Sequence, residues 1–159
     1  LLKRTEMLND GTVDWAAGEM FAFGSLLLEG HPIRMSGQDV RRGTFSNRHA
    51  VVVDKETGAD LFPLRSLVND PNQFHIYDSF LSEYAVMGFE YGYSVERENA
   101  LVIWKPSLET SQMELKQLLM NLSHLHYKNG ASAHQLCCCY LMDMKDKDQI
   151  TLQGGLKDF

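Results

Sequence analysis

The side chains of this chain that are best placed to do chemistry are one carboxylate and one basic pair. Glu83 follows Ser82, a helix-capping residue type, so its carboxylate falls in the first turn of an expected helix. In that place it can share a proton with a ring nitrogen of a ligand. Arg48 and His49 are adjacent, and a guanidinium beside an imidazole suits a dicarboxylate substrate. Each feature also has a structural explanation, a helix-dipole partner for Glu83 and a solvated loop for the basic pair.

A second polar cluster consists of Gln38, Asp39, Arg41 and Arg42. It follows a short apolar segment, so we expect it at the end of a strand. There it can orient a neighbouring carboxylate or bind an anionic substrate, and a solvated charged loop is the alternative.

Several familiar site patterns are not supported. Ser36, Asp39 and His49 have the residue types of a hydrolase triad, but the chain has no G-x-S-x-G elbow. It also has no G-x-G-x-x-G or P-loop sequence. A C-terminal group of histidines and three adjacent cysteines matches no zinc-finger spacing. We therefore predict no metal site among the residues His124, His126, His134 and Cys137 to Cys139.

These residues need strands and helices to position them. The pattern predicts a helix over 13–30, with Asp14 as N-cap and Gly30 as its stop, and a second helix from Ser82 to about Ser94. Three strands are expected at Ile33–Ser36, Phe74–Tyr77 and Leu101–Trp104. Alternating strands and helices predict a parallel α/β sheet with its sites at the strand carboxyl ends.

Two further helical features are open to more than one interpretation. Gly88 and Gly92 lie four residues apart, which favours close packing of their helix on the sheet or a close approach to a cofactor. Leucines at helical spacing over 112–126 predict an amphipathic helix.

Composition narrows the function classes. The chain has 159 residues, 44% of them hydrophobic, and a net charge of −6, which argues against nucleic-acid or membrane-surface partners. No apolar run is long enough to span a membrane. The first residue is not Met and no signal peptide is evident, so we expect an internal piece of a longer protein. Cysteines without spaced partners indicate a reducing compartment, a bacterial cytoplasm or a mitochondrial matrix.

Five sequence motifs, in the same order along the chain, resemble those of one enzyme family. They are D-W-A-x-x-E from Asp14, S-G-Q-D-x-x-R-G-T-F from Ser36, R-H-A-V from Arg48, L-S-E-Y-A-V-x-G-F-E-Y-G-Y from Leu81, and L-V-x-W from Leu101. Together they resemble the decarboxylating component of the 2-oxoglutarate dehydrogenase complex over about residues 11–104. Phe80 stands where that family commonly has Pro.

The resemblance implies a thiamine diphosphate-dependent enzyme, with this segment as its transketolase-like pyrimidine-binding domain. Glu83 falls on the glutamate that contacts the aminopyrimidine, and His49 falls on a histidine implicated in binding the 2-oxo acid substrate. Arg48, its neighbour, is predicted to bind the substrate with it. We expect Gln38 and Asp39 to contribute to the cofactor site. The implied partners are a second thiamine diphosphate-binding domain that holds the diphosphate and Mg²⁺, a homodimer partner, and the lipoyl succinyltransferase component.

The resemblance stops after Trp104, where the family continues roughly E-A-Q-F-G-D-F. Codons for Lys105 to Ser111, preceded by one G and divided again, spell those letters, and the same offset turns codons for residues 140–149 into P-H-G-Y-E-G-Q-G-P. We therefore interpret residues 1–104 as a partial domain and 105–159 as a frameshift product. The coding DNA tests this, and a divergent tail whose leucine face packs on the domain is the alternative.

With residues 105–159 lost to the family pattern, we expect an uncovered sheet edge beside Leu101–Trp104 and no activity from the isolated chain. The alternatives are a related 2-oxo acid dehydrogenase component and a non-catalytic interaction module that uses the dimer-forming face.

Overall fold

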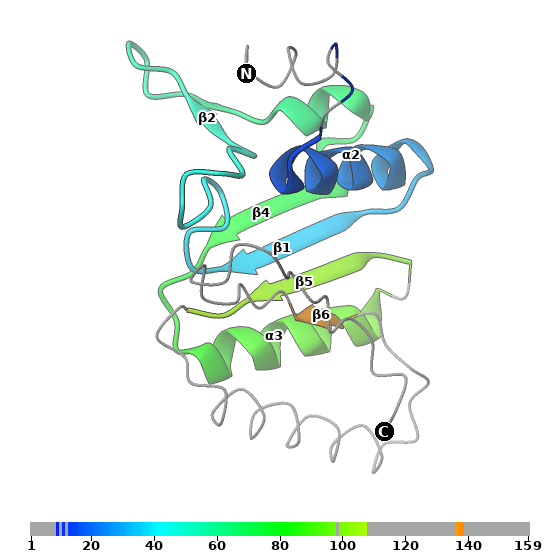
Figure 1. The fold of residues 1–159 in the computed structure, drawn as a ribbon. Coiled ribbons are helices and arrows are strands. Elements are labelled where there is room, and N and C mark those ends of the chain that lie inside the picture. Colours follow the sequence, from blue (N-terminus) through cyan, green and yellow to red (C-terminus); the bar gives the residue numbers. More distant parts are fainter. Residues whose placement is uncertain (1–8, 10, 12, 98, 108–135, 139–159) are drawn as a thin grey trace.

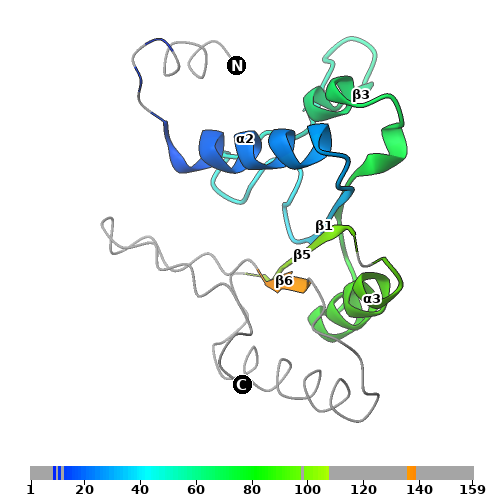
Figure 2. The same ribbon diagram turned by 90° about the vertical axis from the view of Figure 1, so that its right-hand side faces the viewer.

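The computed structural model describes residues 9, 11, 13–97, 99–107 and 136–138. A four-stranded parallel sheet lies at its centre, in the spatial order β4-β1-β5-β6. The strands are β1 (Ile33–Gly37), β4 (Phe74–Asp78), β5 (Leu101–Lys105) and β6 (Leu136–Cys138). Helices α2 (Trp15–Leu28) and α3 (Glu83–Glu96) cover opposite faces (Figure 1; Figure 2). The predicted parallel α/β architecture is confirmed.

Helix α2 begins and ends where its sequence predicts. The Asp14 carboxylate accepts a hydrogen bond from the Ala17 backbone N–H at 2.7 Å, which caps the first turn. Gly30 adopts a φ of 87°, and its N–H donates to the Leu27 carbonyl. The chain then leaves the helix through a left-handed residue, a conformation that glycine adopts without steric cost.

The core lies between α2 and the sheet because alternate strand residues point to the same face. Ile33 and Met35 of β1 are fully buried there, together with Phe74 and Ile76 of β4. Phe23 of α2 joins the same cluster, along with other apolar side chains of that helix. Burying each such side chain stabilises the fold by about 1.5–3 kcal/mol.

The opposite face of the sheet is fastened to α3 by a buried ion pair. Arg34 of β1 donates two hydrogen bonds to the Glu90 carboxylate, at 2.7 and 2.9 Å. The guanidinium also lies 4.8–5.2 Å from the ring centroids of Tyr77, Phe89 and Tyr93. Such bidentate and cation–π contacts set the position of α3 along β1.

The two glycines of α3 do not pack against the sheet, so that interpretation was wrong. Gly88 and Gly92 are exposed, and a Cβ added at either position would meet nothing within 4 Å. Both glycines lie on the outer side of α3 because the ion pair of Glu90 turns the other side toward β1.

A small hairpin stands apart from the main sheet. Strands β2 (Val52–Val53) and β3 (Asp60–Leu61) pair antiparallel around a turn in which Asp54 accepts hydrogen bonds from two backbone N–H groups. Two short 3₁₀ helices, η1 (Pro63–Leu67) and η2 (Pro71–Gln73), then lead into β4.

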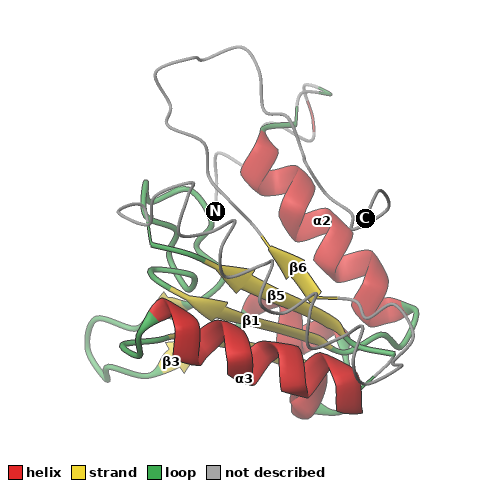
Figure 3. Ribbon diagram, turned by 90° about the horizontal axis from the view of Figure 1, so that it is seen from below, coloured by secondary structure: helices red, strands yellow, loops and turns green. Residues whose placement is uncertain are grey.

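Strand β6 lies where an uncovered edge was expected. Its backbone pairs in parallel with β5 (Figure 3). In the register, Val102 lies opposite Leu136 and Trp104 opposite Cys138. The expectation of a bare β5 edge was therefore wrong over these residues, because pairing requires only free backbone groups and no particular side chains.

Two other expectations for the C-terminal part fall outside the described residues. These are the 112–126 helix and the histidine group of the tail. Within the described part of the chain, no helix has the length and apolar content needed to cross a membrane.

Candidate functional site

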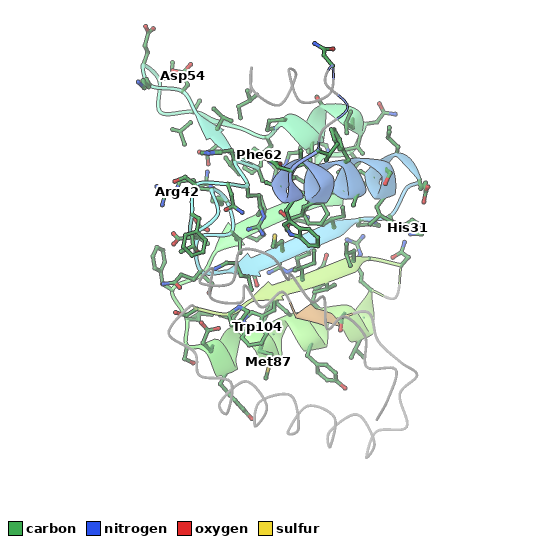
Figure 4. The ribbon with its side chains drawn as sticks, in the orientation of Figure 1. His31, Arg42, Asp54, Phe62, Met87 and Trp104 are labelled. Carbon is green, nitrogen blue, oxygen red and sulfur yellow. The ribbon has the colours of Figure 1, made fainter. Side chains whose placement is uncertain are left out.

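The predicted site residues gather where the strands of the parallel sheet end. Arg42 lies at this end of the sheet in Figure 4, and His31 lies at the opposite end. Trp104, near the end of β5, lies on the α3 side of the sheet in the same view. Parallel strands bring their carboxyl ends to one edge, which is where open α/β sheets bind ligands.

Glu83 is held at this edge by two donors. The indole Nε1–H of Trp104 donates to Oε2 at 3.1 Å, and the Ser107 backbone N–H donates to Oε1 at 2.6 Å. Ser82 caps α3 by accepting a long hydrogen bond, 3.4 Å, from the Ala85 N–H, which confirms the predicted helix start. The carboxylate is thus oriented by the strand end as well as by its own helix.

The Glu83 carboxylate can accept a further hydrogen bond, such as one from a protonated ring nitrogen of a ligand. A carboxylate has about four lone-pair sites. Trp104 and Ser107 occupy two of them, so capacity remains for a further donor. Glu83 is half-buried, which leaves it accessible while its two fixed N–H partners limit its rotation.

The Gln38–Asp39 turn follows β1 at the same edge. Asp39 is half-buried and has a φ of 51°, a left-handed conformation that is uncommon outside glycine. The Gln38 carbonyl accepts a hydrogen bond from the Lys105 ammonium at 2.8 Å. Nearby, the Asp78 carboxylate accepts one from the Arg41 backbone N–H at 3.1 Å, which ties the loop to β4.

Arg48 and His49 are consecutive but differ in environment. Arg48 is 4% exposed, and its guanidinium donates two hydrogen bonds to Glu19 of α2, at 2.7 and 2.9 Å, and one to the Val40 carbonyl. His49 is exposed, with a φ of 49°. The structure thus separates the predicted pair into an internal anchor and a surface imidazole, and substrate binding by either residue stays a prediction.

Three contributors to this site were not predicted as such. Trp104 appeared only as the last residue of a strand, while Lys105 and Ser107 were placed in the tail. The alternation along β5 was the available signal, since a strand extended by one residue turns Trp104 and Lys105 to opposite faces of the sheet.

Lys105 is a buried cation at this edge. It is 1% exposed, and burial lowers the pKa of its ammonium below the usual 10.5. The positive charge of Arg48 lowers it further, whereas the carboxylates of Asp39, Glu83 and Asp78 raise it. Burial and the charge of Arg48 together outweigh the acidic neighbours.

Gly37 lets β1 approach the end of β5 closely. It has a φ of 136°, and a Cβ added there would lie 2.0 Å from the Lys105 carbonyl oxygen. Only glycine fits at this point, so the strand end at the site depends on it. In the described part of the chain, no three His, Cys, Asp or Glu side chains form a metal-binding group.

Comparison with known proteins agrees with this placement. Residues 11–107 match the family described as transketolase, pyrimidine binding domain, which is more than half of the chain. The chain belongs to this family. The pyrimidine-binding domain implies thiamine diphosphate as the cofactor, and the fit of Glu83 to a ring nitrogen accords with it.

Relatives of this chain carry the name multifunctional 2-oxoglutarate metabolism enzyme. The protein of Mycobacterium sp. (strain JLS) is 50% identical over 111 residues, and that of Mycolicibacterium vanbaalenii is 51% identical over the same length. Each alignment covers 66% of this chain and 9% of the relative. The pyrimidine-binding domain thus corresponds to a small part of those enzymes.

Proposed function

We propose that this chain supplies the pyrimidine-binding part of an enzyme that decarboxylates 2-oxoglutarate and passes the succinyl group to a lipoyl carrier. The observation that carries the proposal is the Glu83 carboxylate, held at the carboxyl edge by Trp104 and Ser107. The names of the relatives, at 50–51% identity, support 2-oxoglutarate as the substrate.

In this proposal Glu83 is the general acid–base residue. Its free lone pairs accept the N–H of the aminopyrimidine ring nitrogen, and the carboxylate exchanges a proton with that atom. Thiamine diphosphate, when bound, supplies the carbanion-stabilising chemistry of the decarboxylation. The exposed imidazole of His49 lies at the C-terminal end of the loop that follows β1, where it can form a hydrogen bond with the substrate carboxylate.

The rest of the site belongs to partners in this proposal. Mg²⁺ and the diphosphate are held by a second cofactor-binding domain, across a homodimer interface. Exposed apolar side chains directly before and within α3 favour that contact: Phe80, Leu81, Tyr84 and Phe89. The lipoyl succinyltransferase component receives the product, in a bacterial cytoplasm or a mitochondrial matrix.

A chimera tests the proposal. The segment of the Mycobacterium sp. (strain JLS) enzyme that aligns with residues 11–107 is replaced by those residues, and 2-oxoglutarate-dependent CO₂ release is measured. We expect activity in the chimera and a loss of about 10²–10⁴-fold in Glu83→Gln, because general acid–base catalysis contributes that much. Glu56→Gln, in the exposed hairpin turn, is the matched control.

Other results of the chimera experiment would support the alternative functions or contradict the proposed one. A chimera that prefers pyruvate or a branched 2-oxo acid over 2-oxoglutarate indicates the related dehydrogenase component. Full activity in Glu83→Gln contradicts the role proposed for this carboxylate. For the isolated 159-residue chain we expect no turnover, since the diphosphate-binding domain is supplied elsewhere in this proposal.

A further inference from the structure

The loop that carries Asp39 and His49 adopts a backbone that needs external support. Three of its residues that are not glycine have left-handed φ angles: Asp39 at 51°, Ser46 at 54° and His49 at 49°. Such conformations persist only where the surrounding structure enforces them. Contacts between this loop and the rest of the fold are therefore part of the site.

Hydrogen bonds inside the loop close it on itself. Gly43 N–H donates to the Asp39 carbonyl at 2.7 Å, and His49 and Ala50 N–H groups donate to the Arg42 and Arg41 carbonyls, both at 2.9 Å. These bonds shape the loop, but they do not place it relative to the sheet.

Side chains attach the loop to the rest of the fold at several points, among them the ion pair of Arg41 with Asp60 of β3. Arg48 binds Glu19 of α2, and the Asp78 side chain at the end of β4 binds the Arg41 N–H. At the start of the loop, Lys105 donates from Nζ to the Gln38 carbonyl at 2.8 Å. Lys105 belongs to β5, and the residue before it in that strand, Trp104, donates a hydrogen bond to Glu83.

Lys105 is suited to this work by its burial and its place in the strand. It is 1% exposed, and its ammonium also lies 3.5 Å from the Pro106 carbonyl oxygen. Strand alternation turns it toward the loop while Trp104 turns toward α3 and donates to Glu83. Two consecutive residues thus contact the two halves of the site from opposite faces of the sheet.

We propose that Lys105 is a positioning residue, whose buried ammonium fixes the Gln38–His49 loop to the strand end that holds Glu83. The relevance of this role to catalysis rests on the proposed function, whereas the attachment itself is a property of the folded chain. It is independent of how the codons for residues 105–159 arose. The acidic neighbours, Asp39 and Asp78 with Glu83, compensate part of the penalty for burying the cation.

Amide hydrogen exchange on the full 159-residue chain, without cofactor, tests this role. In Lys105→Met we expect the amides of Gly43, His49 and Ala50 to exchange at least about tenfold faster, as for the loss of one charged hydrogen bond. Amides within α2 serve as the internal reference and stay at the wild-type rate. Lys105→Arg retains the cation and restores protection, and Lys55→Met, at the exposed hairpin turn, has no effect on the loop.

Unchanged loop exchange in Lys105→Met overturns the proposal, as does an equal effect of Lys55→Met or a failure of Lys105→Arg to restore protection. If Lys105→Met does not fold, ¹⁵N spectra of the lysine ammonium groups in the wild type and in Lys105→Arg test the attachment instead. We expect one slowly exchanging ammonium in the wild type that disappears in Lys105→Arg, and its absence from the wild type refutes the attachment. None of these readouts requires thiamine diphosphate, so an inactive chimera contradicts only the proposed function.

Discussion

Replacing Arg48 with methionine distinguishes an internal anchor from a substrate ligand. The guanidinium donates two hydrogen bonds to Glu19 and one to the Val40 carbonyl, and the residue is 4% exposed. Methionine retains much of the apolar length and removes every donor. The Glu19 carboxylate, whose side chain is 17% exposed, is then left without its partner.

The expected loss of stability follows from that geometry. Removing one partner of a buried ion pair costs about 3–5 kcal/mol, and the partial exposure of Glu19 favours the lower end, about 3 kcal/mol. With a urea m-value of about 2 kcal/mol/M, the unfolding midpoint falls by about 1.5 M. Far-UV circular dichroism and tryptophan fluorescence measure the transition.

Two further variants make the result specific. Arg42→Met, at an exposed position of the same loop, is expected to stay within about 0.5 kcal/mol of the wild type. The double variant Glu19→Gln/Arg48→Met should lose less than the sum of its single variants, by about 0.5–3 kcal/mol, because the residues are in contact. A loss below about 1 kcal/mol in Arg48→Met, or strict additivity, refutes the anchor role.

Three other predictions follow from local contacts. Asp14→Ala removes the cap of α2 and lowers the unfolding free energy by about 1 kcal/mol in urea titrations. Gly37→Ala places a Cβ 2.0 Å from the Lys105 carbonyl and costs more than about 3 kcal/mol, whereas Gly58→Ala, also left-handed but in open space, costs about 1–2 kcal/mol in the same assay. Because the pKa of Lys105 is lowered in the folded state, the unfolded chain binds the extra proton, and stability rises with pH from the folded pKa toward 10.5. Unfolding titrations across that window should show this rise in the wild type and its loss in Lys105→Met, and equal pH slopes contradict it.

The main elements of the fold were predictable because local patterns specify them. Asp14 and Gly30 mark the ends of α2, Ser82 marks the start of α3, and all three are confirmed. The three expected strands are present, each longer by one residue at its carboxyl end. That single residue matters at the site, because on β5 it is Lys105.

Other features depend on which face an element turns inward. Packing of Gly88 and Gly92 on the sheet was one of two interpretations, but the ion pair between Arg34 and Glu90 turns them outward. The pairing of β6 with β5 joins residues more than thirty positions apart, and no local pattern near Cys137 indicates it.

The sequence by itself determined the family words, the order of strands and helices, and the placement of Glu83 in the first turn after a strand. These are short-range properties, set by caps, turns and hydrophobic spacing. Only the tertiary structure decided that Arg48 points inward while His49 is exposed, and that Trp104 and Lys105 contact different halves of the site. Those outcomes depend on partners distant in sequence, whose burial and charge decide which polar groups are paired within the fold.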